Sequence, residues 1–375
     1  MTRERDRKHP GRRRTVLLGA VTVAAAVALV PTTGAAAGGP SLAPHAGAAS
    51  VRNAPDPPGP FVTLLFSRSE ESAADNCVEN DTNIATLSGT IAPYLASFGL
   101  GPDGLPRMAG TGTLVTKRTN DTTRFCTHYN DDLTASWADA TDLAQNYGWH
   151  FVSHTATYPS LAAIQNFTPQ QAMAQTCGSE QTIAAHGLPG AAGMIAYPGS
   201  YTKNPAVVNL QTNYGDTCFD WGRQYDHSVH GQNFLSTAST TPPHWVYPVA
   251  VVGGPCNDPT QPCYNVHVQN GRYTMPSTII NQIHRLKPGM WYIFQAYILV
   301  TGTNPNYTSD KMRWDCTSPN PAEHWTNVTV RYCYSDYQQI IQAIAQDPNI
   351  TVTDPLTVGR AWGRVPPQPG TERAR

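Results

Sequence analysis

Short apolar runs alternate with amphipathic segments from Phe61 onward, which predicts a chain of strands and helices. We expect strands at Phe61–Phe66, Gly112–Thr116, Trp149–Ser153, Ala192–Tyr197, Val207–Leu210, Trp245–Val252, Trp291–Val300 and Ile350–Thr353. We expect helices at Ile84–Phe98, Thr134–Tyr147, Pro169–His186, Ser277–Leu286 and Tyr334–Ala345, with Thr134 as an N-cap. Strands that alternate with helices predict an α/β fold with parallel strands.

The first 37 residues have the order of a secretory signal. Residues 1–14 are basic, residues 15–30 are apolar, and small residues follow around Ala35 and Ala37. The apolar run is shorter than the ~20 residues of a membrane span, although an uncleaved anchor is the alternative. We therefore expect a secreted, extracellular protein, exported by the general or the twin-arginine route, with no membrane span after signal cleavage.

The remaining chain divides by composition. Residues 38–60 are rich in Ala, Pro and Gly and predict a flexible leader. Residues 61–360 are expected to form the folded domain, and residues 361–375 a C-terminal tail. Residues 211–274 are rich in turn formers and aromatics, and they are a candidate insertion within that domain.

Removal of the signal changes the charge of the protein. The whole chain has a formal net charge of −1, but residues 1–37 hold seven Lys or Arg and only two acids. The mature chain therefore has 18 basic and 24 acidic residues, a net charge of −6. Because phosphate binding needs a basic surplus, this charge argues against a nucleic-acid partner.

All the cysteines lie in the mature part, and their even number in an exported chain favours disulfides. They are Cys77, Cys126, Cys177, Cys218, Cys256, Cys263, Cys316 and Cys333. Pairing of neighbours along the chain is the simplest arrangement, and Cys256 with Cys263 is its firmest pair because a short, Pro-bounded loop joins them. Other pairings stay open. Metal-binding thiolates are disfavoured, since no C-x-x-C occurs.

Hydrogen-bonding and aromatic residues follow several of the expected strands, where parallel sheets build their binding sites. The candidates are Arg68, His154, Tyr158, Tyr197 and Tyr297, with Trp149, Asp220 and Trp221 as weaker ones. Aromatic rings with scattered polar groups suit a sugar or another polar ligand. The alternative is that these are ordinary strand-end residues. His227 and His230 have a spacing that suits a metal, but they lack an evident third ligand.

Two segments resemble the polysaccharide deacetylase family, the NodB-homology fold. Residues 146–159, Asn-Tyr-Gly-Trp-His-Phe-Val-Ser-His-Thr-Ala-Thr-Tyr-Pro, resemble its G-x-x-x-x-S-H-T-x-x-H-P element. Residues 185–199 contain Ala-His-Gly and Ile-Ala-Tyr-Pro-Gly, which resemble its F-A-Y-P-x-G element. The resemblance implies a distorted (β/α) barrel that removes acetyl groups from glycans with a divalent metal, usually zinc.

The residues that would carry this chemistry depart from the family's pattern. In the family an Asp and two His hold the metal, a second Asp is the base and a late His is the acid. Here Leu-Phe-Ser-Arg-Ser at residues 65–69 stands in place of T-F-D-D-G, so Arg68 replaces a carboxylate. His154 matches the first metal-binding His. Tyr158 takes the place of the second metal-binding His, and Tyr297 takes the place of the late acid His.

We therefore predict no zinc cofactor and a protein that binds a glycan or cell-wall polysaccharide in the residual cleft, with His154 as the one catalytic candidate. The alternative is an active carbohydrate deacetylase with altered metal ligands or mechanism. Iron held by Tyr158 and Tyr297 or an aspartate from the first loop, Asp75 or Asp81, would supply such ligands. A third alternative is a disulfide-stabilised surface protein whose cleft is inert.

Overall fold

The computed structural model describes residues 59–66, 87–119, 125–127, 132–134, 136–198, 204–223, 233–234, 245–246, 250–252, 275–304, 314–320, 325–326 and 331–361. The chain divides into Met1–Ala54 and Pro55–Arg375, and every described residue belongs to the second unit. The signal at residues 1–37 and most of the leader and tail lie outside the described residues, so those assignments stay predictions.

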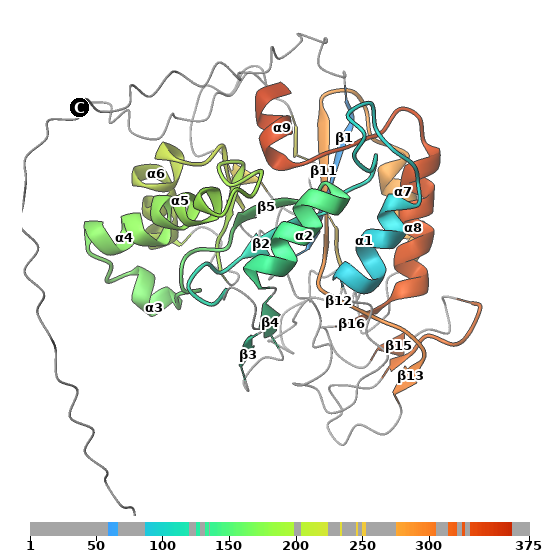
Figure 1. Cartoon of the computed structure of the whole chain (residues 1–375), viewed down its shortest axis with the longest axis horizontal. Helices are drawn as coiled ribbons and strands as arrows, with labels where there is room; N and C mark the ends of the chain where they lie inside the picture. Colours follow the sequence, from blue (N-terminus) through green and yellow to red (C-terminus); the bar gives the residue numbers. More distant parts are fainter. Residues whose placement is uncertain are drawn as a thin grey trace, which may run out of the picture. The chain divides into compact units, whose positions relative to one another are not determined.

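A large sheet forms the centre of the described chain (Figure 1). Its strands follow the order β10-β11-β1-β2-β5-β6-β7-β9, with β17 beside β1 and β8 beside β11. Their bounds are β1 Phe61–Phe66, β2 Thr111–Leu114, β5 His150–Ser153, β6 Met194–Ala196, β7 Trp221–Arg223, β8 Asn233–Phe234, β9 Trp245–Val246, β10 Ala250–Val252, β11 Met290–Ala296 and β17 Thr351–Val352. All of these pairs are parallel except β8 with β11, which confirms the α/β prediction.

The sheet curls back on itself. Strands β9 and β10 stand at opposite ends of the strand order, yet only three residues separate Val246 from Ala250. A segment of that length spans at most about 14 Å, so the two edges of the sheet must approach each other. The rings of Trp221 on β7 and Trp291 on β11 lie 5.2 Å apart although four strands stand between them in the order. The sheet is therefore a curled, barrel-like sheet of parallel strands.

Alternate residues on each strand divide between the inside and the outside of this barrel. On β11, Trp291 and Ile293 belong to the interior core, while Tyr292 and Phe294 belong to the outer core beneath the helices. The interior core also holds Phe61, Leu65, Val152, Met194, Trp221, Val246 and Val358. This follows from the period of two in a strand, and it lets each face of the sheet bury its own apolar set.

Helices cover the outside of the barrel, except for α9, which lies at one end. Their bounds are η2 Leu87–Ile91, α1 Ala92–Ala96, α2 Trp137–Tyr147, α3 Leu161–Ile164, α4 Pro169–Gln175, α5 Cys177–Ala185, α6 Pro205–Asn213, η3 Gly215–Thr217, α7 Pro276–Ile283, α8 Tyr334–Gln346 and α9 Pro355–Ala361. Helix α7 packs on α8, α1 on α2, α4 on α5 and α3 on α6. In Figure 1 the group α1, α2, α7 and α8 lies to the right and α3 to α6 to the left.

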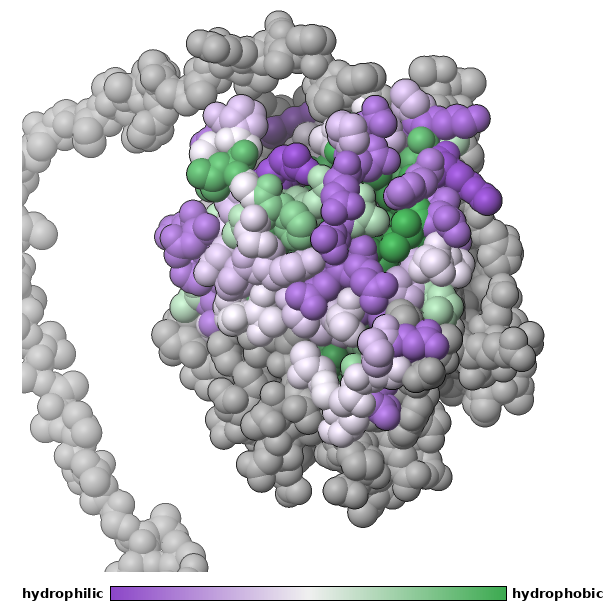
Figure 2. Space-filling view, turned by 90° about the vertical axis from the view of Figure 1, so that its right-hand side faces the viewer, coloured by the Kyte–Doolittle hydropathy of each residue, from purple (hydrophilic) through white to green (hydrophobic). Residues whose placement is uncertain are grey.

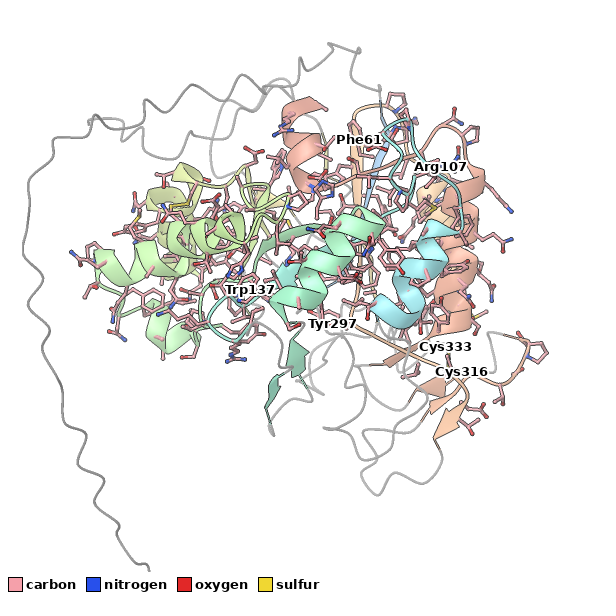
Figure 3. All side chains as sticks on the ribbon, in the orientation of Figure 1. Phe61, Arg107, Trp137, Tyr297, Cys316 and Cys333 are labelled. Atoms are coloured by element: carbon pink, nitrogen blue, oxygen red, sulfur yellow. A yellow bond between two sulfur atoms is a disulfide. The ribbon has the colours of Figure 1, made fainter. Side chains whose placement is uncertain are left out.

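Helix α9 closes the amino-terminal end of the barrel. The Asp354 carboxylate caps it, accepting from the Leu356 and Thr357 amides at 2.8 and 3.2 Å. The Trp221 indole Nε1 donates to the Pro355 carbonyl at 3.1 Å, which ties α9 to β7. Phe61 and Tyr297, labelled in Figure 3, mark the two ends of the barrel, and the carboxyl ends of the strands lie opposite α9.

Three small sheets lie beyond the barrel. They pair β3 Phe125–Thr127 with β4 Asp132–Thr134, and β12 Ile298–Val300 with β16 Arg331–Cys333. The third joins β13 Thr303–Asn304, β14 Trp314–Asp315 and β15 Trp325–Thr326. Disulfides join Cys316 to Cys333 and Cys177 to Cys218, both neighbours along the chain as predicted. Cys77, Cys256 and Cys263 and the side chain of Cys126 lie outside the described residues.

Two of the predicted elements are wrong. The strand expected at Val207–Leu210 lies inside helix α6, because the Asn204 side chain accepts from the Ala206 amide and Pro205 opens the helix. Thr134 is not the N-cap of α2, since it lies in β4 and Ser136 forms the cap with Asp139 in a capping box.

Other predicted elements are divided by the structure. The helix expected at Pro169–His186 breaks at Thr176, whose φ and ψ are −102° and −95°. The strand expected at Trp245–Val252 becomes β9 and β10, and that at Trp291–Val300 becomes β11 and β12. Region 211–274, the candidate insertion, contributes β7, β8, β9 and β10 to the main sheet.

The described surface carries few large exposed apolar side chains. Leu100 is 68% exposed, and Leu105 and Met173 are the other two. On the face shown in Figure 2, hydrophilic and neutral residues predominate and hydrophobic ones form small groups. No helix in the described ranges is long and apolar enough to cross a membrane. Polar groups buried in the barrel are therefore the stronger candidates for a site.

The close approach of Gly110 to the Trp149 indole gives a test of the packing. A Cβ at Gly110 would lie 2.6 Å from a ring atom of the fully buried Trp149, which has no room to yield. We expect Gly110→Ala to lower the free energy of unfolding by about 1–3 kcal/mol in urea. Gly178→Ala in α5, where the Cβ would meet its nearest atom at 3.4 Å, is the control and should not destabilise the protein. Equal effects of the two substitutions would contradict this packing.

Candidate functional site

Adjacent strands place a row of residues at the carboxyl end of the barrel. The register pairs Ser153 with Ile195 on β5 and β6, and Ala196 with Arg223 on β6 and β7. His154, Ala196 and Arg223 therefore stand side by side across these strands. We call these three residues the mouth row. Ile195, the residue before Ala196, belongs to the apolar core around helices α3 and α6. The mouth row lies on the opposite face of the sheet from that core.

The mouth row points into the barrel. Its members each stand two residues after a side chain of the interior core, namely Val152, Met194 and Trp221. Side chains two apart along a strand share a face. Ala196 carries only a methyl group, and neighbouring strands lie about 4.8 Å apart, so roughly 10 Å separates the backbones of His154 and Arg223. The two large polar side chains thus flank a small one.

His154 is held in a defined orientation. The side chain is 2% exposed, and Nδ1 lies 2.6 Å from the Ala196 carbonyl oxygen. Because a carbonyl can only accept, Nδ1 donates the hydrogen, and the neutral imidazole then carries its lone pair on Nε2. The Tyr158 ring meets the imidazole edge to face, with 4.9 Å between the ring centres. This fixes the tautomer in which Nε2 is an acceptor.

Arg223 is a site residue that the sequence reasoning missed. The side chain is fully buried on β7, and its Nη1 donates to Gln295 Oε1 on β11 at 3.3 Å. Gln295 stands two residues beyond Ile293 of the interior core, so both partners face inward. The signal in the sequence is the alternation of Trp221 and Arg223, two residues apart within region 211–274.

The loop after β5 has an unusual backbone. Thr155 and Tyr158 have φ values of 67° and 57°, a left-handed conformation that non-glycine residues seldom adopt. The Ser153 Oγ accepts from the Thr155 amide at 3.0 Å, and the Thr155 Oγ1 accepts from the Tyr158 amide at 3.0 Å. Such conformations cluster at binding sites, where surrounding contacts hold them. Here they set the direction of Tyr158 beside His154.

The break between α4 and α5 supports this loop from outside the barrel. Gln175, the last residue of α4, accepts from the Thr157 amide at 3.1 Å. Ser179, on the first turn of α5, shares a hydrogen bond of 2.5 Å with Ser153. The helix break therefore lets two polar side chains, one from each helix, contact the same loop. In a continuous helix these two side chains would point in other directions.

Tyr197 lies on the outer face of the sheet. Its hydroxyl donates to Gln211 Oε1 at 2.7 Å, and its ring packs in the core of α3 and α6. Burial, reinforced by the Asp216 carboxylate, raises the pKa of the Tyr197 phenol well above its usual value. The structure therefore does not bring Tyr197 together with His154.

The other predicted site residues are distributed as follows. Tyr297 is 8% exposed and stands where β11 gives way to β12, two residues beyond Gln295. Tyr158 meets His154, and the guanidinium of Arg118 lies over the Tyr158 ring at 5.5 Å from its centre. Arg68, Asp75, Asp81, His227 and His230 lie outside the described residues.

The three weaker candidates lie at the amino ends of their strands. Trp149 precedes β5 and packs on Phe66, with 4.9 Å between ring centres. Trp221 is tied to α9 by its indole nitrogen, and Asp220 stands against Gly359 of α9. The structure thus separates them from the mouth row, because Trp149 and Asp220 precede their strands and Trp221 is the first residue of β7.

The groups around His154 do not suit zinc. Within the described ranges, no three His, Cys, Asp or Glu side chains gather closely enough to hold a metal ion. Zinc in proteins is bound by imidazole, thiolate and carboxylate. The groups that the described structure brings to the carboxyl end beside the imidazole are phenols, guanidinium groups and the Gln295 amide. A fixed positive charge opposes a divalent cation. The described residues therefore do not fit the metal that the sequence resemblance implies.

Comparisons with known proteins assign no family. No protein-family model and no curated protein sequence matches the chain. Among solved structures it is similar to a "putative polysaccharide deacetylase" from Mycobacterium smegmatis, with 12% identity and a TM-score of 0.40. The alignment covers 82% of this chain and 92% of that one. A similarity of this size assigns neither a family nor an activity.

The left-handed loop gives a second prediction. Thr155→Val keeps the shape of the side chain but removes the acceptor of the Tyr158 amide. We expect a loss of about 1–2 kcal/mol in unfolding free energy and faster hydrogen exchange at the Tyr158 amide. Thr182→Val is the control, because its hydroxyl bonds only to Gly178 within α5. Unchanged exchange at Tyr158 in the first variant would show that the threonine hydroxyl does not hold the loop.

Glu180, next to Ser179 on α5, predicts a pH dependence of stability. It is 7% exposed, and burial raises the pKa of its carboxyl above 4.5. The folded state therefore keeps this proton to higher pH than the unfolded state, and stability falls as pH rises through the folded pKa. Glu180→Gln should raise the unfolding free energy at about pH 7 and leave it almost unchanged at about pH 4, in urea titrations. A gain of the same size at both pH values would refute the linkage.

Proposed function

We propose that the protein is an exported binding protein that holds a glycan or cell-wall polysaccharide at the carboxyl end of its barrel. The observation that carries the proposal is the mouth row, in which His154 and Arg223 flank Ala196 inside the barrel. Buried hydrogen-bonding groups at the carboxyl ends of parallel strands are the usual basis of ligand recognition in such folds. Hydroxyl-rich ligands need this mixture of donors and acceptors.

The side chains of the mouth have complementary roles in this proposal. His154 Nε2 accepts a hydrogen bond from a ligand hydroxyl, because Nδ1 is committed to the Ala196 carbonyl. Arg223 donates, with Gln295 fixing one nitrogen of its guanidinium. The rings of Tyr158 and Tyr297 offer apolar faces against which a sugar ring packs, as aromatic side chains do in ligand sites.

Binding rather than metal-dependent hydrolysis is supported by the donor set. Arg68, Tyr158 and Tyr297 stand where the resembled family has a metal-binding Asp, a metal-binding His and a late acid His. The described neighbours of His154 do not fit zinc either. Export is supported by the signal-like residues 1–37 and agrees with the two described disulfides, which persist in oxidising compartments.

An active deacetylase of altered mechanism is the second candidate, and the orientation of His154 favours it. An imidazole that donates from Nδ1 to a fixed carbonyl presents Nε2 as a general base. In this alternative, His154 takes a proton from water that attacks an acetyl ester or amide. The release of acetate distinguishes it from simple binding.

Titration calorimetry of the secreted protein against soluble cell-wall oligosaccharides, acetylated and deacetylated, tests the proposal. We expect binding without acetate release and with far less than one zinc per chain. His154→Ala should weaken binding at least about tenfold, or roughly 1.4 kcal/mol. His284→Ala, an exposed histidine at the end of α7, is the matched control and should leave affinity unchanged.

Two outcomes contradict the proposal. Stoichiometric zinc with acetate release that depends on His154 would establish the deacetylase instead. Failure of every oligosaccharide to bind, with the fold intact, would favour a protein whose barrel mouth is inert.

A further inference from the structure

We propose that the Cys177–Cys218 disulfide holds the loop after β5 in place, and that a dithiol which opens this disulfide loosens the mouth of the barrel. For ligand binding the inference rests on the proposed function, because it adds a form of control to the same site. The effect on the loop itself is measurable without any ligand.

The disulfide lies at the break between α4 and α5. Cys177 is the first residue of α5 and directly follows Thr176, the residue at which the two helices part. Its partner Cys218 directly follows η3, in the segment that leads into β7. One covalent bond therefore joins the helix break to the approach to β7.

The two sides of the break carry the side chains that support the loop. Gln175 ends α4, and its Oε1 accepts from the Thr157 amide at 3.1 Å. Ser179 lies on the first turn of α5, with its hydroxyl 2.5 Å from that of Ser153. The Ser153 hydroxyl in turn accepts from the Thr155 amide at 3.0 Å. A shift of the chain at the break therefore displaces both supports of the loop.

The start of α5 has no side-chain cap. Thr176 occupies the N-cap position, but its hydroxyl donates back to the Ala172 carbonyl of α4 at 2.8 Å. Helix α4, by contrast, begins with a capping box of Thr168 and Gln171. Further along α5, Ile183 is fully buried in the outer core. Packing therefore holds the far end of α5, and the disulfide is a covalent restraint on its uncapped first turn.

A dithiol reductant opens the disulfide by two successive exchange steps. Cys218 is half-buried and Cys177 is only 6% exposed, so the first thiolate attacks the Cys218 sulfur. Cys177 leaves as a thiolate and takes a proton. The second thiol of the reductant then displaces the Cys218 sulfur, which also takes a proton. The bridge gains two electrons and two protons, which the dithiol loses as it becomes a disulfide.

The opened bridge keeps a polar partner. The Tyr214 carbonyl oxygen lies 3.6 Å from the Cys177 sulfur and 3.5 Å from the Cys218 sulfur. A thiol is a weak donor, so this carbonyl is an acceptor within reach of both. We therefore expect opening to leave the barrel folded and to release mainly the helix break and the loop that it supports.

Hydrogen exchange at single amides of the purified protein tests the inference. In the double variant Cys177→Ser with Cys218→Ser, the Thr155 and Thr157 amides should exchange at least about tenfold faster relative to the Ile293 amide. Ile293 lies in the central strand β11, so this ratio removes any general loss of stability. Dithiothreitol should change the ratio in the native protein in the same way once both cysteines react with an alkylating agent.

The other disulfide in the described part of the chain provides the matched control. Cys316→Ser with Cys333→Ser removes a bridge that joins β16 to the segment after β14, beyond the barrel. This variant should leave the exchange ratio unchanged. In calorimetry with the cell-wall oligosaccharides, only the variant without the Cys177–Cys218 bridge should bind more weakly, by at least about threefold, because its loop is less preorganised.

The outcomes separate this inference from the proposed function. An unchanged exchange ratio in the Cys177→Ser and Cys218→Ser variant overturns the inference and leaves the proposed function standing. Loss of the whole fold when the bridge opens also overturns it, since the bridge would then support the domain and not one loop. Faster exchange with unaltered affinity overturns the link to binding. Failure of every oligosaccharide to bind overturns the proposed function, while the exchange ratio still decides the role of the disulfide.

Discussion

The curl of the parallel sheet is the constraint on which the rest of the structure depends. Three residues join β9 to β10, and these strands lie at the two ends of the sheet order. The sheet must therefore close far enough for Trp221 and Trp291 to meet inside it. In the curled sheet, alternate side chains point into the barrel, and the two ends of its interior hold different residues. Apolar rings and α9 fill its amino end, and His154, Arg223 and Gln295 lie toward its carboxyl end.

Hydrogen bonds from outside the barrel support the strained backbone of the loop after β5. Thr155 and Tyr158 have left-handed conformations, and Ser153 and Gln175 accept hydrogen bonds from the amides of this loop. Ser179 in turn bonds to the Ser153 hydroxyl. The cost of such conformations is of order 1–3 kcal/mol each, and a rigid outer support is needed to offset it. The broken helix α4–α5 supplies that support. Packing outside the barrel thereby fixes the direction of side chains at its mouth.

Much of this arrangement was accessible from the sequence. The apolar runs of β1, β5 and β11 predicted buried strands, and the resemblance around residues 146–159 singled out His154 and Tyr158, which the structure brings into contact. The barrel's own topology confirmed the parallel α/β expectation. Strong local periodicity determines such elements, and residues that follow strands gather at one end by geometry.

Other features depend on contacts that no local pattern reveals. Val207–Leu210 begins with two β-branched valines, yet the cap at Asn204 commits the segment to a helix. The three-residue strand that holds Arg223 is too short to be recognised in the sequence, and its pairing with β6 sets its position. The sequence alone therefore could not place the Arg223 guanidinium inside the barrel. Tyr197 alternates to the outer face, whereas its motif suggested a site residue. Register and curl, which are properties of the whole sheet, decide the positions of Arg223 and Tyr197.

The measurement that tests the central claim most directly is the NMR signal of the His154 ring nitrogens, observed with and without an oligosaccharide. The account predicts a neutral imidazole protonated at Nδ1, with an Nε2 resonance that moves when the glycan binds and does not move when zinc is added. Protonation at Nε2, or an Nε2 resonance that responds to zinc and not to the glycan, would contradict it.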